Sequence, residues 1–466
     1  DQVARLRRGE FDASLLPSII NNYKVDQYRA LQSNSSRADM FVDAFINEQK
    51  WGDVVTRLER ISHITKEQIV AFANHYLGDN NYITVYKQQG VDSTQKKIDK
   101  PAITAIPSNR DYQSRFVSEI KDSKVEPIQP QFVNFKRDLT FTKTKKGLPV
   151  VYKQDAESGL STLALHWEMG ECADNRYSVA TDYLDYVGTQ SKTLAQIKKE
   201  LYRLGCFTSF STGPTYINLV ISGLDETLPE ALTVVEDIMH NAKADAKAYS
   251  DLTSLYEKDR ADAKKNQRNN FAALRYMGQY GEYNPQTNDM SIDEMRKTAP
   301  QTLLALIKAL PTYKHEILYC GPRSLKDLVK LFDKVHQTPK TLKEPLKNKE
   351  YTEQTTPKNE VWIAPYEAKN IYMAMYHNDN KAWNADEVPV SALFNEYFGG
   401  GMNTVVFQEL REARGLAYSA SAFFTYQPHK GHPVYGVTNI ISQNDKMADC
   451  IRVFNEILDT IPQSEK

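Results

Sequence analysis

The sequence predicts an α+β protein made of repeated units, each a mainly antiparallel sheet packed with helices. The first observation is an internal repeat, in which "YVGTQSKTLAQIKKELYRLGCFTSFS" (186–211) aligns with "YFGGGMNTVVFQELREARGLAYSASA" (397–422). The second is that each copy runs as a helix, a glycine and an alternating, strand-like stretch. The third is that a hairpin-like stretch precedes each copy and another helix follows it. Self-similarity of this kind indicates two copies of one architecture.

Residues 1–95 are expected to form the closing half of an earlier unit, helical and ending in a strand. The opening "DQVARLRRGEFD" is typical of a helix in progress that stops at a glycine. In "ISHITKEQIVAFANHYLG", Thr65 is the expected N-cap, Gln68 occupies the capping-box position and Gly78 stops the helix. "NNYITVYKQQG" then predicts a short strand.

Residues 96–135 are rich in lysine, serine and proline and predict an extended linker. A full unit follows at 136–345, beginning with the hairpin-like "LPVVYKQDAESGLSTLALHWEMG" and ending in "TAPQTLLALIKALPTYKHEILYCG", whose layout matches residues 65–87. Residues 350–466 then form the opening half of another unit, starting from the hairpin-like "VWIAPYEAKNIYMAMYHND". We therefore expect the chain to be part of a longer protein at both ends.

Composition bounds the function classes. The chain has 466 residues, 41% hydrophobic and 25% charged, which suits a globular protein of two to four domains. Its formal charge of −1 gives no reason to expect nucleic acid or an anionic membrane as a partner, and no apolar run approaches the roughly 18 residues of a membrane helix. The cysteines form no CxxC pair and are expected to be buried or idle thiols: Cys172, Cys206, Cys320 and Cys450.

The stretch "GGGMNTVVFQELREARGLAYS" resembles the pitrilysin/insulinase family of zinc peptidases, the inverzincins. "GEFDASLLPSIINNYK" and "ITKEQIVAFANHYLGDNNYITVYK" are similar to helices of that family. The resemblance implies a clam-shell of four related α+β domains (LuxS/metallohydrolase-like) around a chamber. Residues 1–95 would close the second domain, 136–345 would be the third, and 350–466 would open the fourth.

The zinc chemistry of this family needs H-x-x-E-H on a helix, and the chain lacks it. The repeat places the motif at Val179–Tyr183 in one unit and at Val390–Phe394 in the other, and neither stretch can hold zinc. Asp182 alone keeps a carboxylate there, either as a relic base or as a packed or hydrated helix residue. His429 and His432 lie three apart across a glycine, which favours solvated loop residues over a metal site. We expect no cofactor in this chain, and zinc in a preceding N-terminal domain of the parent.

Arg411 and Tyr418 are the candidate site residues. The resemblance implies that Arg411 donates to a substrate carbonyl and that the Tyr418 hydroxyl steadies the oxyanion, both in one cavity. The pattern alone favours a different interpretation, in which Arg411 belongs to a helical charge ladder: Glu409, Glu412 and Arg414.

The local pattern also predicts how these two side chains are presented. The helix from Val405 should turn Phe407 and Leu410 inward and end at Gly415. The strand that follows should place Leu416, Tyr418 and Ala420 on one face. The triple glycine 399–401 is expected to be a tight turn, because no lysine follows it as in a phosphate-binding loop.

These observations predict the substrate-binding, non-zinc C-terminal portion of a zinc metalloendopeptidase. The alternatives are a catalytically dead family member that acts as a scaffold subunit, and a stand-alone peptide-binding module. The expected partners are peptide or unfolded polypeptide and the zinc-bearing N-terminal half. A homo-oligomer is a further alternative. Alone, the chain should hydrolyse no peptide. The resemblance gives the bacterial periplasm or cell envelope as the leading compartment.

Overall fold

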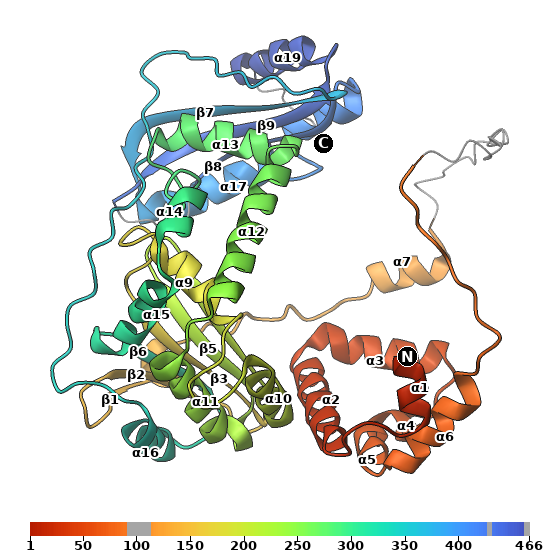
Figure 1. Cartoon of the computed structure of the whole chain (residues 1–466). Helices are drawn as coiled ribbons and strands as arrows, with labels where there is room; N and C mark the ends of the chain where they lie inside the picture. The colour runs from red at the N-terminus through yellow and green to blue at the C-terminus, as the bar shows by residue number, and fades with distance from the viewer. Residues whose placement is uncertain (91–112, 426–430, 461–466) are drawn as a thin grey trace. The chain divides into compact units, whose positions relative to one another are not determined.

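The computed structural model describes residues 1–90, 113–425 and 431–460 (Figure 1). By its internal contacts the chain divides into two units. The first comprises residues 1–17 and 51–140, and the second comprises residues 18–50 and 141–466. The α+β fold class predicted from the sequence is confirmed.

The first unit is helical. Its helices are α1 (Gln2–Arg7), α4 (Trp51–Val55), α5 (Arg57–Ser62), α6 (Lys66–Tyr76), α7 (Arg115–Lys121) and α8 (Phe135–Asp138). The predicted capping box at Thr65 and Gln68 is confirmed. α1 packs against α6, where Asn74 Nδ2 donates to the Arg7 carbonyl over 2.8 Å. Gly9 ends α1 with a φ of 69°, a backbone conformation that glycine adopts without strain.

The strand predicted in "NNYITVYKQQG" does not form. Residues 82–88 have no regular secondary structure, and Tyr82, Ile83 and Val85 are 71%, 90% and 87% exposed. A strand is held by hydrogen bonds to a neighbouring strand, and the described residues supply none here. The prediction was wrong because it used the local pattern, which does not report whether a partner strand exists. The described part of the predicted linker, 113–135, is exposed and carries α7.

The second unit begins with two helices, α2 (Leu15–Gln32, shared with the first unit at its start) and α3 (Asn34–Ile46). α2 packs on the sheet described next, where Val25 is fully buried against Leu160 and Leu224. Asn21 and Asn22 donate their side-chain amides to the last carbonyls of a further helix, Arg203 and Tyr202, over 2.8 Å each. These bonds join α2 to the C-terminal turn of that helix (Leu194–Leu204), where carbonyls point out of the helix toward other donors.

A six-stranded sheet forms the centre of this unit, with strand order β1-β2-β6-β3-β5-β4. The strands are β1 (Thr140–Lys143), β2 (Pro149–Gln154), β3 (Leu160–Trp167), β4 (Cys206–Thr212), β5 (Ile217–Leu224) and β6 (Glu316–Gly321). The hairpin predicted over 148–170 is therefore wrong in its pairing. β6 lies between β2 and β3, parallel to the first and antiparallel to the second, so a strand from much further along the chain separates them.

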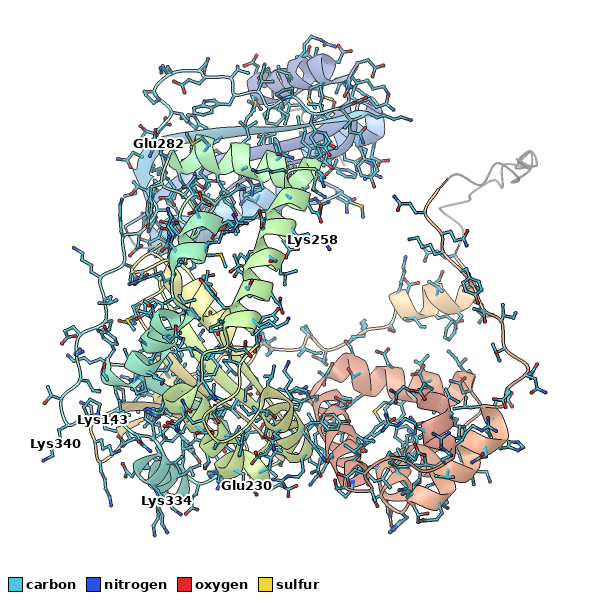
Figure 2. All side chains as sticks on the ribbon, in the orientation of Figure 1. Lys143, Glu230, Lys258, Glu282, Lys334 and Lys340 are labelled. Atoms are coloured by element: carbon cyan, nitrogen blue, oxygen red, sulfur yellow. The ribbon has the colours of Figure 1, made fainter. Side chains whose placement is uncertain are left out.

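Helices pack with this sheet: α9 (Arg176–Leu184), α10 (Leu194–Leu204), α11 (Leu228–Asn241), α12 (Ala246–Ala263), α14 (Ile292–Lys297), α15 (Pro300–Ala309) and α16 (Leu325–Val335). α13 (Gln267–Tyr280) lies instead against the C-terminal sheet described below, where Phe271 packs on Tyr372 (Figure 1). The core between sheet and helices is fully closed around Trp167, Met169 and Tyr183, each 0% exposed. Charged side chains such as Lys258 on α12 and Lys334 on α16 point away from this core into solvent (Figure 2).

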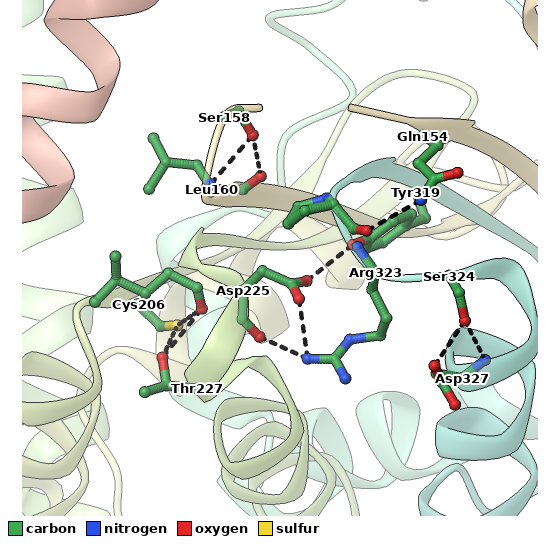
Figure 3. A network of polar contacts seen from close by, with 12 residues as sticks. Gln154, Ser158, Leu160, Cys206, Asp225, Thr227, Tyr319, Arg323, Ser324 and Asp327 are labelled. Atoms are coloured by element: carbon green, nitrogen blue, oxygen red, sulfur yellow. Dashed lines mark hydrogen bonds and ion pairs between the residues drawn. The ribbon is translucent and has the colours of Figure 1, made fainter. Parts of the chain in front are cut away.

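A largely buried ion pair joins Asp225, which follows β5, to Arg323, which lies two residues beyond β6 (Figure 3). The Arg323 guanidinium lies 3.0 Å from the Asp225 carboxylate and donates to the Asp225 carbonyl over 2.6 Å. The Tyr319 hydroxyl donates to the same carboxylate over 2.8 Å and accepts from the Arg323 amide over 2.9 Å. The network fixes the end of β6 against the residue that follows β5.

The C-terminal part of the second unit is a three-stranded antiparallel sheet, ordered β7-β9-β8, with helices. Its elements are β7 (Asn370–Ala382), α17 (Val388–Phe398), α18 (Val405–Phe407), the π-helix η4 (Gln408–Ala413), β8 (Ala417–Phe424), β9 (Pro433–Gln443) and α19 (Met447–Thr460). Of the hairpin predicted over 361–379 only β7 forms, and Val361 and Ile363 are 85% and 81% exposed. The order helix, helix, glycine, strand, strand, helix runs through both 176–241 and 388–460. Among the described residues, the helices include none that is both long and apolar enough to cross a membrane.

Candidate functional site

The segment around Gly415 departs from regular structure on both sides. The predicted helix starts as α18 but continues as the π-helix η4, in which Leu410 is fully buried. Gly415 has a φ of 57° and its amide donates to the Arg411 carbonyl over 3.0 Å. The Leu416 amide reaches back to the Leu410 carbonyl over 2.9 Å. The glycine stop is confirmed, and the wider π turn is a feature that helical periodicity did not predict.

A β-bulge lies on the other side of the glycine. Ala417 pairs with Ser442 and Ser419 pairs with Ile441, which leaves Tyr418 as the extra residue of strand β8. Tyr418 is 73% exposed, whereas Ala420 is 4% exposed. The expectation that the two side chains share one face is therefore wrong, because the bulge breaks the strict alternation of the strand. Tyr418 is turned to solvent as a result.

The two irregularities bring Arg411 and Tyr418 together. The Arg411 guanidinium carbon lies 5.8 Å from the centre of the Tyr418 ring and 4.9 Å from that of Phe407. A cation over aromatic faces is attracted by the ring quadrupoles, which holds the long side chain near the tyrosine. The Arg411 side chain stays 43% exposed. The Arg411 guanidinium and the Tyr418 side chain are therefore both accessible to a ligand.

The predicted helical charge ladder involves Arg414 rather than Arg411. Arg414 pairs with Glu409, whereas the carboxylate that Arg411 reaches among the described residues is that of its sequence neighbour Glu412, at 3.8 Å. A contact of that length between exposed groups contributes little to stability. Within the part of the chain that the structure describes, the aromatic rings are the main partners of Arg411.

The corresponding positions of the first copy differ in chemistry and in use. Glu200 takes the place of Arg411 and pairs with Lys192 over 2.5 Å. Phe207 takes the place of Tyr418, and its ring lies 4.8 Å from the guanidinium carbon of Arg29 on α2. This position offers no hydroxyl, and its half-exposed ring is contacted by an arginine of another helix.

The side chains at the positions of the missing metal motif do not form a set of metal ligands. In α9 Val179 and Tyr183 are buried, and the Tyr183 hydroxyl donates to the Asp245 carbonyl over 2.7 Å. Asp182 accepts from the Tyr256 hydroxyl over 2.5 Å. In α17 Val390 and Leu393 are exposed and apolar. The described residues contain no group of three histidine, cysteine or carboxylate side chains arranged to hold a metal.

Two further predictions have an outcome in this region. His432 is not a solvated loop residue, since its ring lies between two carboxylates, 2.9 Å from Glu353 and 3.2 Å from Glu350. These pairs raise the pKa of His432, chiefly through the hydrogen bond to Glu353. Sequence reasoning missed them because the partners lie far apart along the chain. His429 lies outside the described residues.

The first residue of the triple glycine, Gly399, packs against β8, where a Cβ would lie 2.2 Å from the Ala422 carbonyl oxygen.

The cysteines differ in their exposure to solvent. All four cysteines are free; Cys172, Cys206 and Cys450 are buried, and Cys320 is exposed. Burial raises the pKa of the Cys206 thiol.

The sequence did not reveal the cluster of His315, His336 and Glu236. His336 lies 2.6 Å from Glu236 and 3.0 Å from His315. Burial lowers the pKa of His315 to about 4.

Comparison with family models gives a match over residues 316–465, described as the peptidase M16 inactive domain. The resemblance to the pitrilysin family is confirmed. The matched M16 region contains Arg411 and Tyr418, and it starts at β6 of the central sheet. No curated protein matches the chain.

Solved structures share the fold at low sequence identity. An M16 inactive domain from Pseudomonas fluorescens is 17% identical, with a TM-score of 0.57 over 70% of this chain and 80% of that one. The periplasmic protease PqqL from Escherichia coli is 12% identical, with a TM-score of 0.58. The ferredoxin protease FusC, solved with Arabidopsis ferredoxin, is 11% identical, with a TM-score of 0.58. The last two matches cover 99% of this chain but 54% of the other, so the chain spans about half their length.

Proposed function

We propose that this chain is the substrate-binding, non-zinc C-terminal portion of a zinc metalloendopeptidase that degrades peptides in an enclosed chamber. The observation that carries the proposal is the exposed pair of Arg411 and Tyr418, 5.8 Å apart within the region that matches the M16 inactive domain. The extent of the matches adds support, because the chain aligns with about half of two longer proteases. The metal would be held by a preceding N-terminal half.

The roles of the two residues follow from their chemistry. A guanidinium has several donors in a fixed fork and can hold a substrate carbonyl in place. A tyrosine hydroxyl can donate to the oxygen of a substrate carbonyl as negative charge develops on it. Tyr418 keeps its hydroxyl in solvent because the bulge turns it out of the strand, and Arg411 is held beside it by the ring contacts.

The proposal includes a domain layout. Residues 1–95 would close the second domain, 96–135 would form the linker, 136–345 the third domain and 350–466 the opening half of the fourth. The third and fourth domains would be homologous units, which is supported by their common order of helices, glycine and strands. The compartment would be the bacterial periplasm or cell envelope, by analogy with PqqL, which is a periplasmic protease.

A catalytically dead scaffold subunit is the alternative. The apolar side chains at the motif positions, Val179 in α9 and Val390 in α17, are compatible with both functions, because the metal of an active parent would be held in the preceding half. The two functions differ in one property of the parent protein, namely whether it cleaves peptides.

Kinetics of the full-length parent test the proposal. Tyr418→Phe should lower kcat about 100-fold with little change in KM, since removal of one oxyanion donor has an effect of that order. Arg411→Ala should chiefly raise KM. Arg414→Ala on the same helix and Tyr202→Phe, an exposed tyrosine on α10, are the matched controls and should leave both constants unchanged. A parent that cleaves no peptide would support the scaffold. A parent in which Tyr418→Phe and Tyr202→Phe behave alike would refute the role of Tyr418.

A further inference from the structure

The second unit holds a cavity of about 740 Å³ that the proposed roles of Arg411 and Tyr418 do not use. Most of its lining comes from three stretches of the chain: the turn between β4 and β5, the connecting residues Glu350–Glu353, and the C-terminal sheet with α17. Cys172, after β3, and Tyr280, at the end of α13, complete it. Neither Arg411 nor Tyr418 is among the lining residues.

The wall of the cavity is largely aromatic. The rings come from both ends of the unit: Tyr216, Tyr280, Tyr351, Trp383, Phe424 and Tyr435. Several are fixed by neighbouring rings, with centres 6.1 Å apart for Tyr280 and Tyr351. Aromatic faces carry the negative end of a quadrupole and attract a cation placed over them.

The charges in the cavity are predominantly negative. Glu350, Glu353 and Glu396 line it, and the lining residues that the structure describes include no lysine or arginine. Both ring nitrogens of His432 lie within 3.2 Å of carboxylate oxygens, an arrangement that favours the imidazolium, because only that form donates from both nitrogens. Among the described lining residues, three carboxylates face at most one imidazolium, so at least two negative charges are in excess.

The carboxylate of Glu396 is the one available to a ligand. It forms no ion pair with any residue that the structure describes, and its residue is exposed. Its position is fixed from the preceding residue, since Asn395 is buried and exchanges two hydrogen bonds of 2.8 Å with the backbone of Phe424. Glu396 is thereby held where α17 meets the end of β8.

The opposite wall is also fixed in place. The Glu353 side chain is only 9% exposed. The next residue, Gln354, donates its amide to the Gln279 carbonyl over 2.7 Å and accepts from the Tyr376 hydroxyl over 2.9 Å. These bonds join the connecting segment to α13 and to β7. The cavity therefore exists before a ligand arrives.

We infer that this cavity binds the side chain of an arginine in a polypeptide. A guanidinium is planar, stacks on aromatic rings and pairs with a carboxylate through two parallel hydrogen bonds, so it satisfies both the rings and Glu396. The inference rests on the proposed function only in taking the ligand to be a polypeptide. Its charge and shape requirements come from the cavity.

Direct binding to the chain of 466 residues tests the inference without catalysis. The first probe is the peptide acetyl-Gly-Gly-Arg-Gly-Gly-amide. In the second, citrulline replaces the arginine, because citrulline has nearly the same shape but is neutral. In the third, lysine replaces the arginine. Titration calorimetry should give a dissociation constant about tenfold lower for the arginine peptide than for the citrulline peptide, with lysine between them. Glu396→Gln should weaken the arginine peptide about fivefold, within the range of a partly exposed charge pair. Glu157→Gln, an exposed carboxylate in the β2–β3 loop, is the matched control and should have no effect.

A second measurement locates the ligand. A photoreactive benzoylphenylalanine beside the arginine should crosslink to fragments that contain Glu353 or Trp383. Equal affinity for arginine and citrulline, equal effects of Glu396→Gln and Glu157→Gln, or crosslinks confined to other fragments would each overturn the inference. Loss of the proposed peptidase function would leave all three results unchanged, so the two failures can be told apart.

Discussion

Replacement of Asp225 by asparagine should loosen the end of β6. The change leaves the Arg323 guanidinium without its carboxylate in a site where the two side chains are 19% and 11% exposed. Arg323 has no spare partner nearby, because its Nε is already buried without a hydrogen bond. Breaking a buried pair from one side costs about 3–5 kcal/mol. Since both groups keep some contact with solvent, we expect about 3 kcal/mol.

Hydrogen exchange of the β6 amides, followed by mass spectrometry, measures this cost. A loss of about 3 kcal/mol corresponds to an increase of about 100-fold in the exchange rate, where exchange follows the opening equilibrium. Asp251→Asn is the matched control: its pair with Lys247 lies on the surface, with side chains 62% and 83% exposed, so its loss should leave the exchange rates unchanged. Adding Arg323→Met to Asp225→Asn should restore part of the protection, since no unpaired charge remains. If both single variants exchange alike, the network does not hold β6.

Two further predictions concern stability. The pKa of His315 is about 4 in the folded chain and 6.5 as a reference, so the unfolded chain binds more protons between these values. The contribution of His315 to stability should therefore be complete above pH 6.5 and fall by about 3 kcal/mol as pH drops to 4. Urea unfolding at several pH values measures this, and a His315→Gln variant that keeps the full slope would contradict it. Gly415→Ala should cost about 1 kcal/mol, because φ is 57° and no atom lies within 4 Å of the added Cβ. Gly401→Ala, also in open space but without a positive φ, should be neutral in the same thermal melts, and equal effects would exclude backbone strain.

The features that the sequence predicted correctly depend on contacts within a few residues. Thr65 and Gln68 cap α6 through bonds that span three positions, and Gly415 ends its helix because of its own backbone freedom. The M16 resemblance rests on a contiguous stretch and was also found. Such features need no knowledge of what lies elsewhere in the fold.

Strand pairing was decided only by the tertiary structure. The stretches "NNYITVYKQQG" and "HEILYCG" have similar strand-like patterns. The second becomes β6 because it pairs with β2 on one side and with β3 on the other. The first stays exposed because no described strand pairs with it. The hydrogen bonds that make a strand come from a neighbour, so the pattern alone could not separate the two cases.

The candidate sites show the same division. The sequence placed Arg411 and Tyr418 seven residues apart, but a π turn and a β-bulge set their 5.8 Å approach, and both depend on how the segment packs against β9. The pairing of His432 with Glu353 joins residues 79 positions apart. Packing between distant segments determined which side chains meet, because their separation along the chain carries no information about their distance in space.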